Sequence, residues 1–189
     1  MRRVSVCLLA LTAAVAALLA VAQPPQPADA RTGSRAVSAT RALSAIKTHR
    51  AATWRWQKLM GAQLTPSDYS ERRATNVRYL DWLESLWKRR AHRARRRASR
   101  PPHLSAWLCI HRYERHAAQG WSTRTGNGYY GGLQMDLGFQ RRYARDLLRR
   151  KGTADRWTRL EQMWVAERAH RAGRGFWPWP NTARACGLI

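Results

Sequence analysis

The stretch WSTRTGNGYYGGLQM, residues 121–135, decides how the C-terminal half of the chain folds. It holds four glycines within seven positions, so it cannot form the interior of a helix. Asn127-Gly128 is typical of a hairpin turn, because both residues tolerate a positive φ. Gly131-Gly132 allows the backbone to approach closely, either to another part of the chain or to a ligand. The stretch therefore predicts a small β-hairpin.

The segment before this hairpin, HLSAWLCIHRYERHA (residues 103–117), predicts a helix. Trp107, Ile110 and Glu114 are spaced at i, i+3 and i+7, so the carboxyl group of Glu114 ends an apolar stripe. Burial at that place would raise the pKa of Glu114 and favour a protonated form that can act as an acid. The alternative is an ordinary surface glutamate that pairs with a neighbouring arginine.

Tyr129 and Tyr130 stand on the predicted hairpin, beside the helix that ends with Glu114. Aromatic rings that face a carboxyl group suit a sugar chain, because the rings can stack on the sugars while the acid acts on the glycosidic bond. The alternative is that both rings only pack the hairpin against the domain.

The composition indicates anionic surroundings. The 189 residues include 35 Lys and Arg against 11 Asp and Glu, a formal net charge of +24. Nucleic acid, an anionic membrane surface and an anionic cell-wall polymer are all compatible with this charge. With 44% hydrophobic residues and ten tryptophans, the chain can also bury a substantial core.

The N-terminus helps to choose among these three kinds of anionic partner. Two arginines precede an uncharged apolar stretch from Val4 to Ala22, and small residues follow at the spacing of a cleavage site, so residues 1–30 predict a secretory signal peptide with a proline-rich stub. The alternative is an uncleaved membrane anchor. We expect a secreted protein of the cell wall or extracellular space, without nucleic acid as a partner and without stable membrane insertion once the signal is removed.

The cysteines agree with secretion. Cys7 leaves with the signal, and the two that remain, Cys109 and Cys186, can pair in an oxidising compartment. Such a bridge would contribute about 4 kcal/mol through loop entropy. The alternative is two buried free thiols. No metal site is expected, because the sequence has no CxxC and no paired His/Cys spacing.

Residues 31–102 predict a helical, arginine-rich extension and linker. We expect a flexible lead-in over residues 31–43 and a helix over residues 44–60 that ends at Gly61. Residues 65–68, TPSD, have the chemistry of a second helix start, with Thr65 as the cap. The apolar face of that second helix is spaced three and four residues apart: Tyr79, Leu80, Leu83, Leu86 and Trp87.

The second helix continues into KRRAHRARRRASR, residues 88–100, in which eight of thirteen residues are Lys or Arg. Pro101-Pro102 ends any helix there. The run is either a solvated basic linker or a positive docking strip for an anionic polymer, and the sequence leaves both open.

Several motifs together now suggest a family. CIHRYE, a tryptophan, TGNGYYGGLQM, QMWVAER and WPNTARACGL follow in this order, and residues 103–189 thereby resemble the transglycosylase-like domain of the resuscitation-promoting factors. These are secreted, lysozyme-like proteins that cleave peptidoglycan. The resemblance implies an α+β, mostly helical, lysozyme-like domain with a small β-hairpin, peptidoglycan glycan strands as partner and no cofactor.

The resemblance also implies roles for single residues. Glu114 takes the place of the catalytic glutamate, and Cys109 and Cys186 match the family's disulfide in kind. The expected substrate-binding positions are Trp121, Asn127, Tyr129, Tyr130, Gln134 and Trp179. The family usually has ESGGNW where this chain has ERHAAQGW, which is two residues longer and lacks the Ser-Gly-Gly.

The other carboxylates of residues 103–189 have structural interpretations. Asp146 and Asp155 lie among arginines and are expected in salt bridges, Glu161 completes a T-x-x-E capping box, and Glu167 is expected to brace the core. Asp136 is the one further candidate near the hairpin. We therefore expect a single-acid mechanism at Glu114, with hydrolysis and transglycosylation both open.

The expected core of the domain consists of Trp107, Leu108, Leu160, Trp164 and Val165. Trp177 could line the groove or pack structurally. Two other functions remain possible: a non-catalytic cationic cell-wall-binding protein on a lysozyme-like fold, and a cationic antimicrobial protein that acts on membranes.

Overall fold

The computed structural model describes residues 27–189. Most of the predicted signal peptide, including Cys7, lies outside the described residues. Within the described part the protein is mostly helical with one small two-stranded antiparallel sheet, so the predicted α+β class is confirmed at this level. No helix in this part is both long enough and apolar enough to cross a membrane.

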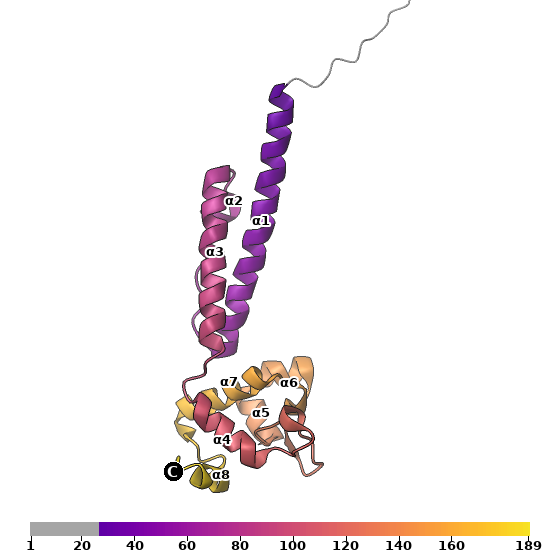
Figure 1. The fold of residues 1–189 in the computed structure, drawn as a ribbon, viewed down its shortest axis with the longest axis vertical. Coiled ribbons are helices and arrows are strands. Elements are labelled where there is room, and N and C mark those ends of the chain that lie inside the picture. Colours follow the sequence, from indigo (N-terminus) through magenta and orange to yellow (C-terminus); the bar gives the residue numbers. More distant parts are fainter. Residues whose placement is uncertain (1–26) are drawn as a thin grey trace, which may run out of the picture.

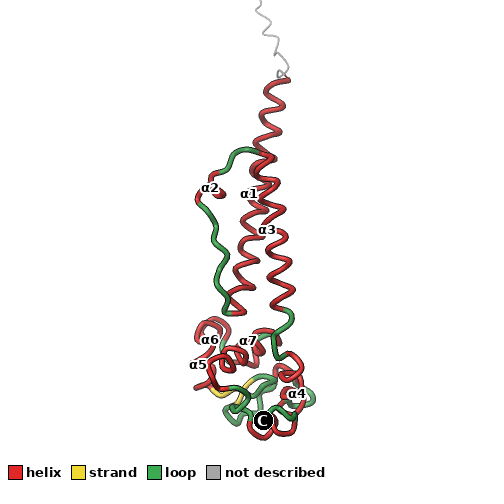
Figure 2. Tube along the Cα trace, turned by 90° about the vertical axis from the view of Figure 1, so that its left-hand side faces the viewer, coloured by secondary structure: helices red, strands yellow, loops and turns green. Residues whose placement is uncertain are grey.

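The N-terminal part is a pair of long helices, α1 (Pro27–Met60) and α3 (Val77–Ala98), which lie side by side (Figures 1 and 2). Both helices run toward the C-terminal part, so they are parallel, and residues 61–76 must return along the length of α3. Figure 2 shows this return segment beside the two helices, with the short helix α2 (Tyr69–Arg73) near its far end.

The prediction of a flexible lead-in over residues 31–43 is wrong, because α1 already begins at Pro27. Residues 31–43 are helical because Ala42 and Ile46 are buried against Leu80 and Leu83 of α3. Residues 33–38 are helical but exposed, so this contact lies only at the end of the predicted lead-in. Burial of Leu80, Leu83 and Trp87 confirms the main part of the predicted apolar face of α3, whereas Tyr79 is exposed.

The predicted helix start at Thr65 is wrong. The Thr65 backbone and hydroxyl are bound to α1, because its N–H donates to Gln57 Oε1 (3.0 Å) and its carbonyl accepts from Trp54 Nε1 (2.8 Å). Asp68 instead caps α2, and Asn76 caps α3 by accepting from the backbone N–H of Tyr79 (3.1 Å).

The arginine run continues α3 up to Ala98, as predicted. Ala94 and Ala98 continue the buried face of α3, while the three arginines between them are exposed. Only residues 99–103 separate this helix from the next one.

The C-terminal body, residues 103–189, packs its helices around one core. Trp107 and Val165 belong to this core, as predicted, but Leu108 is exposed, and Trp164 and Leu160 belong to a separate cluster with Met60 and Ala98. The helices are α4 (Leu104–Glu114), α5 (Leu137–Tyr143), α6 (Arg145–Lys151), α7 (Arg159–Ala169) and α8 (Pro180–Ala185). Short helical turns are η1 (Gly120–Ser122), η2 (Ala154–Arg156) and η3 (His170–Arg174).

The predicted hairpin is present as β1 (Tyr129–Tyr130) paired with β2 (Met135–Asp136). A bridge between Arg124 and Tyr130 closes a further turn before it. In that turn the positive φ angles belong to the glycines on either side of Asn127, not to Asn127. Asn127 contributes through its side chain, whose Oδ1 accepts from Thr125 Oγ1 (2.6 Å) and from the N–H of Tyr129 (3.1 Å).

The close approach predicted at Gly131-Gly132 is made to the chain itself. A Cβ atom at Gly131 would collide with Gln162, and one at Gly132 would collide with His111. Gln162 is fully buried and donates from Nε2 to the carbonyls of Trp121 (2.8 Å) and Ala154 (2.9 Å). These contacts fix the hairpin on α4 and α7.

The helix pair is joined to the C-terminal body mainly through α7. Trp164 Nε1 donates to the carbonyl of Ala98 (2.7 Å). The guanidinium groups of Arg168 and Arg171 donate to the last carbonyls of α1, at Leu59 and Met60 (both 2.9 Å). Cations at the carbonyl end of a helix are favourable both as hydrogen-bond donors and with respect to the helix dipole.

Cys109 in α4 and Cys186, directly after α8, form the predicted disulfide, with a Cα–Cα distance of 6.0 Å. The bridge spans 77 residues of sequence. It holds the C-terminal segment against the helix that ends with Glu114.

Replacement of both cysteines by serine is expected to lower the free energy of unfolding by about 4 kcal/mol in the loop-entropy model. Urea denaturation followed by circular dichroism would measure the difference. As a control, alkylation of the folded wild-type protein without reductant should label neither Cys109 nor Cys186. Labelling of both would show that the thiols are free and contradict the bridge.

Candidate active site

A groove of about 250 Å³ opens at the C-terminal end of α4. Its lining brings together three parts of the chain: the end of α4, the hairpin region and the segment that leads into α8. The lining residues are Glu114, Asn127, Tyr129, Gln134, Pro178, Trp179, Pro180 and Asn181.

Glu114 is the last residue of α4, and its position follows from the apolar stripe below it. Trp107 and Ile110 are fully buried, so the next residue on the same stripe comes to the edge of the core and is half-buried. Thr182 Oγ1 donates to Glu114 Oε1 (2.9 Å) and fixes the orientation of the carboxyl group.

Burial raises the pKa of Glu114 above its ordinary value, and the hydrogen bond from Thr182 opposes this shift only in part. Among the described residues Glu114 forms no ion pair, so the alternative of a surface glutamate paired with an arginine does not hold. A carboxyl group in this state can keep a proton at a pH where an exposed one would lose it.

The wall opposite Glu114 comes from the hairpin region. Tyr129 is 46% exposed, so part of its side chain is open to solvent, and Asn127 and Gln134 present amide groups. Gln134 has a positive φ of 46° and donates from Nε2 to the carbonyl of Gly131 (2.8 Å), which holds its side chain at the turn.

Trp179 forms the base of the groove. It is almost fully buried, and its Nε1 donates to the carbonyl of Leu133 (2.6 Å). The same side chain is thus part of the core and part of the groove lining. Trp177, in contrast, is 60% exposed and does not line the groove.

Two of the expected substrate-binding residues lie away from the groove. Tyr130 packs against the core, because alternate residues of a strand point to opposite sides. Trp121 stacks on His111, with ring centroids 3.8 Å apart. His111 donates from Nδ1 to the carbonyl of Gly132 (2.9 Å), and burial lowers its pKa, which favours the neutral ring beneath Trp121.

Sequence reasoning missed Thr182 and Asn181. Both belong to the WPNTARACGL motif, directly after Trp179 and shortly before Cys186. The disulfide was the available signal, because it ties this segment to α4 and therefore to Glu114.

The other carboxylates of the C-terminal body have structural contacts outside the groove. Asp136 caps α5 by accepting from the N–H of Phe139 (2.7 Å). Asp146 pairs with Arg149, as expected, but Asp155 bonds to the hydroxyl of Thr153 and forms no ion pair among the described residues. The predicted capping box at Glu161 is present, with Lys151 as an additional partner, and Glu167 is fully buried in the core.

No group of three or more His, Cys, Asp or Glu side chains gathers in the described part of the chain in a way that could hold a metal ion. The groove can therefore offer one protonatable carboxyl group, three amides, an exposed aromatic ring and an indole base.

No protein-family model matches the chain.

Glu114→Gln is expected to make the protein more stable than wild type at neutral pH. Because burial raises the folded-state pKa, the folded protein holds this proton more tightly than the unfolded chain does. The contribution of Glu114 to stability therefore falls as the pH rises from its ordinary value of 4.5 through the folded pKa. Glutamine has no proton to lose, and it can still accept from Thr182.

Thermal unfolding between about pH 3 and pH 8 would measure this difference, which should vanish at the acid end of the range. Asp146→Asn is the control, because Asp146 is an exposed carboxylate of the same body. A wild type as stable as Glu114→Gln at neutral pH would contradict the buried, proton-holding state of Glu114.

Proposed function

We propose that the protein is a secreted glycosidase that cleaves peptidoglycan at the linkage between N-acetylmuramic acid and N-acetylglucosamine. The observation that carries this proposal is a single carboxyl group, with its pKa raised by burial, in a groove lined by amides and an exposed tyrosine ring. Glycoside cleavage requires an acid at the bridging oxygen, and sugars are bound through stacking and hydrogen bonds.

The arrangement of the C-terminal body supports the lysozyme-like fold that the sequence resemblance implies. A helix carries the acid at its end, a small hairpin forms the facing wall, and a buried helix, α7, crosses the core beneath both. The third part of the groove lining is the segment that leads into α8. The disulfide between Cys109 and Cys186 ties this segment to α4.

In the proposed mechanism the protonated Glu114 donates its proton to the bridging oxygen as the glycosidic bond breaks. The resulting carboxylate then accepts a proton from the nucleophile that attacks the sugar. This nucleophile is either water, which gives a hydrolysed product, or the 6-hydroxyl of the same sugar, which gives an anhydro product. Thr182 keeps the carboxyl group oriented in both steps, since its hydroxyl can donate to Glu114 whether the carboxyl group is protonated or ionised.

The groove supports a single-acid scheme because no second carboxylate lines it. Asp136 is the one other candidate near the hairpin, and its side chain caps the N-terminus of α5. Asn127, Gln134 and Asn181 can bind hydroxyl and acetamido groups of the sugars, and Tyr129 offers a ring face for stacking.

The segment in which this chain departs from the resuscitation-promoting factors does not line the groove. Residues 115–119 lie on the surface after α4, and Thr123 anchors this segment through hydrogen bonds with His116 and Gly120. The longer, glycine-poor loop therefore leaves the surroundings of Glu114 intact, which supports activity over the alternative of a non-catalytic wall-binding protein.

Glu114→Gln is expected to reduce the rate of peptidoglycan cleavage by roughly 10²- to 10⁴-fold, with binding to the wall retained. Glutamine keeps the shape of the side chain but cannot donate the proton. Asp136→Asn is the matched control, and it should change the rate much less. Full activity of Glu114→Gln would refute the site.

Mass spectrometry of the fragments released from purified wall measures both the rate and the product type. Fragments with an anhydro end would indicate transglycosylation, and fragments with a reducing end would indicate hydrolysis. If the wild-type protein binds wall and releases neither, the cationic wall-binding alternative is favoured.

A further inference from the structure

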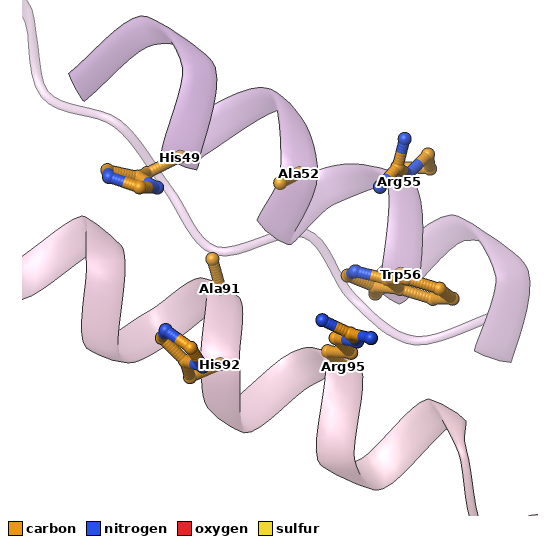
Figure 3. A pocket seen from close by; sticks show the side chains of 7 residues that line it. All are labelled: His49, Ala52, Arg55, Trp56, Ala91, His92 and Arg95. Carbon is orange, nitrogen blue, oxygen red and sulfur yellow. The ribbon is translucent and has the colours of Figure 1, made fainter. Parts of the chain in front are cut away.

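A second and larger cavity, of about 360 Å³, lies between the two long helices. Figure 3 shows its lining, which comes from one face of α1 and one face of α3. The lining residues are His49, Ala52, Arg55, Trp56, Ala91, His92 and Arg95.

The cavity exists because both helices carry a small residue at this place. Elsewhere the seam is filled by large side chains such as Leu83 and Trp87. Ala52 and Ala91 both line the space, and in Figure 3 the methyl group of Ala91 points toward α1. Trp56 forms one end of the space, and the guanidinium of Arg55 lies 5.2 Å from the centre of its ring.

The cavity is cationic and open to solvent, since Arg55, His92 and Arg95 are exposed, and no acidic residue lines it. His49, Arg55, His92 and Arg95 form no side-chain hydrogen bond to protein and no ion pair within the described residues. Arg90 on the same pair differs, because Glu71 lies 4.0 Å from it.

The sequence explains why no acid reaches this cavity. No Asp or Glu occurs between residues 30 and 67 or between residues 85 and 113. The carboxylates of the return segment serve other contacts: Asp68 caps α2, and Glu71 accepts from Trp87 Nε1 (3.1 Å). The donors that line the cavity are therefore free for an external anion.

We propose that this cavity binds a phosphate group of a phosphodiester-containing cell-wall polymer. The lining holds donors from both helices, two guanidinium groups and two imidazole rings. Guanidinium groups match phosphate oxygens well. The open cationic surface of α3 on either side of the cavity suits a chain with repeated negative charges.

The phosphate chemistry rests on the cavity alone, whereas the wall polymer as its source rests on the proposed function. In that setting the site would keep the protein on its substrate. The helix pair is fixed to α7 by Trp164, Arg168 and Arg171, so a polymer held at the cavity has a defined position relative to the groove.

The test is titration calorimetry of the full-length protein with a synthetic glycerol-phosphate oligomer at constant salt. The double variant Arg55→Gln with Arg95→Gln should weaken binding by about tenfold or more, since charged hydrogen bonds are lost. The matched control is Arg93→Gln with Arg97→Gln, which removes the same charge from α3 outside the cavity and should weaken binding much less.

A second variant, Ala91→Leu, fills the cavity without changing the charge and should also weaken binding. Circular dichroism would verify that each variant is folded. Equal losses from the cavity pair and the control pair, or unchanged binding in Ala91→Leu, would overturn the proposal, because binding would then depend on overall charge.

The source is tested with purified wall before and after chemical removal of its phosphodiester polymers, using Glu114→Gln so that cleavage plays no part. Binding should fall on removal, and this fall should be absent in the cavity variants. Equal binding to both walls, or tighter cavity-dependent binding of duplex DNA with the same phosphate content, would overturn the wall polymer as source. Failure of the catalytic proposal would leave the oligomer titration unaffected.

Discussion

The buried carboxylate of Glu167 fixes the helix on which the candidate active site depends. It is fully buried in α7, and its Oε1 accepts from the backbone N–H of His103 and from Trp107 Nε1, both at 2.8 Å. His103 Nδ1 lies 3.1 Å from Oε2. All of these donors belong to the first turn of α4 or its cap, where a negative charge also complements the helix dipole. Glu167 thereby sets the position of α4, and α4 in turn sets Cys109 and Glu114.

The C-terminal segment shows how a site is built from distant parts of a chain. Trp179 bonds to the hairpin at Leu133, Thr182 bonds to Glu114, and Cys186 is bridged to α4. Two hydrogen bonds and one disulfide thus hold this short segment against the end of α4 and the hairpin region. Because the groove lies between these contacts, its shape depends on the segment keeping all three of them.

Structural features that depend on residues close together in the sequence were predicted correctly. Features that depend on contacts between distant residues were not. The stripe that ends at Glu114 and the capping box at Glu161 are local patterns, and both were found. Thr65 has the residue type and neighbours of a helix cap, but Gln57 and Trp54 use its hydrogen-bonding groups, so the chain runs back along α1 instead. Thr182 was missed for the same reason, since its partner lies 68 residues away.

The distribution of charge allows burial to raise the pKa of Glu114 in a protein of net charge +24. A guanidinium or ammonium group close to Glu114 would lower its pKa and remove the acid. No Lys, Arg or His lines the groove, whereas the cavity between α1 and α3 is lined by two arginines and two histidines and has no acid. The side-chain donor to Glu114 is Thr182, which is neutral. The fold thus keeps the excess positive charge out of the groove lining, where burial raises the pKa of Glu114.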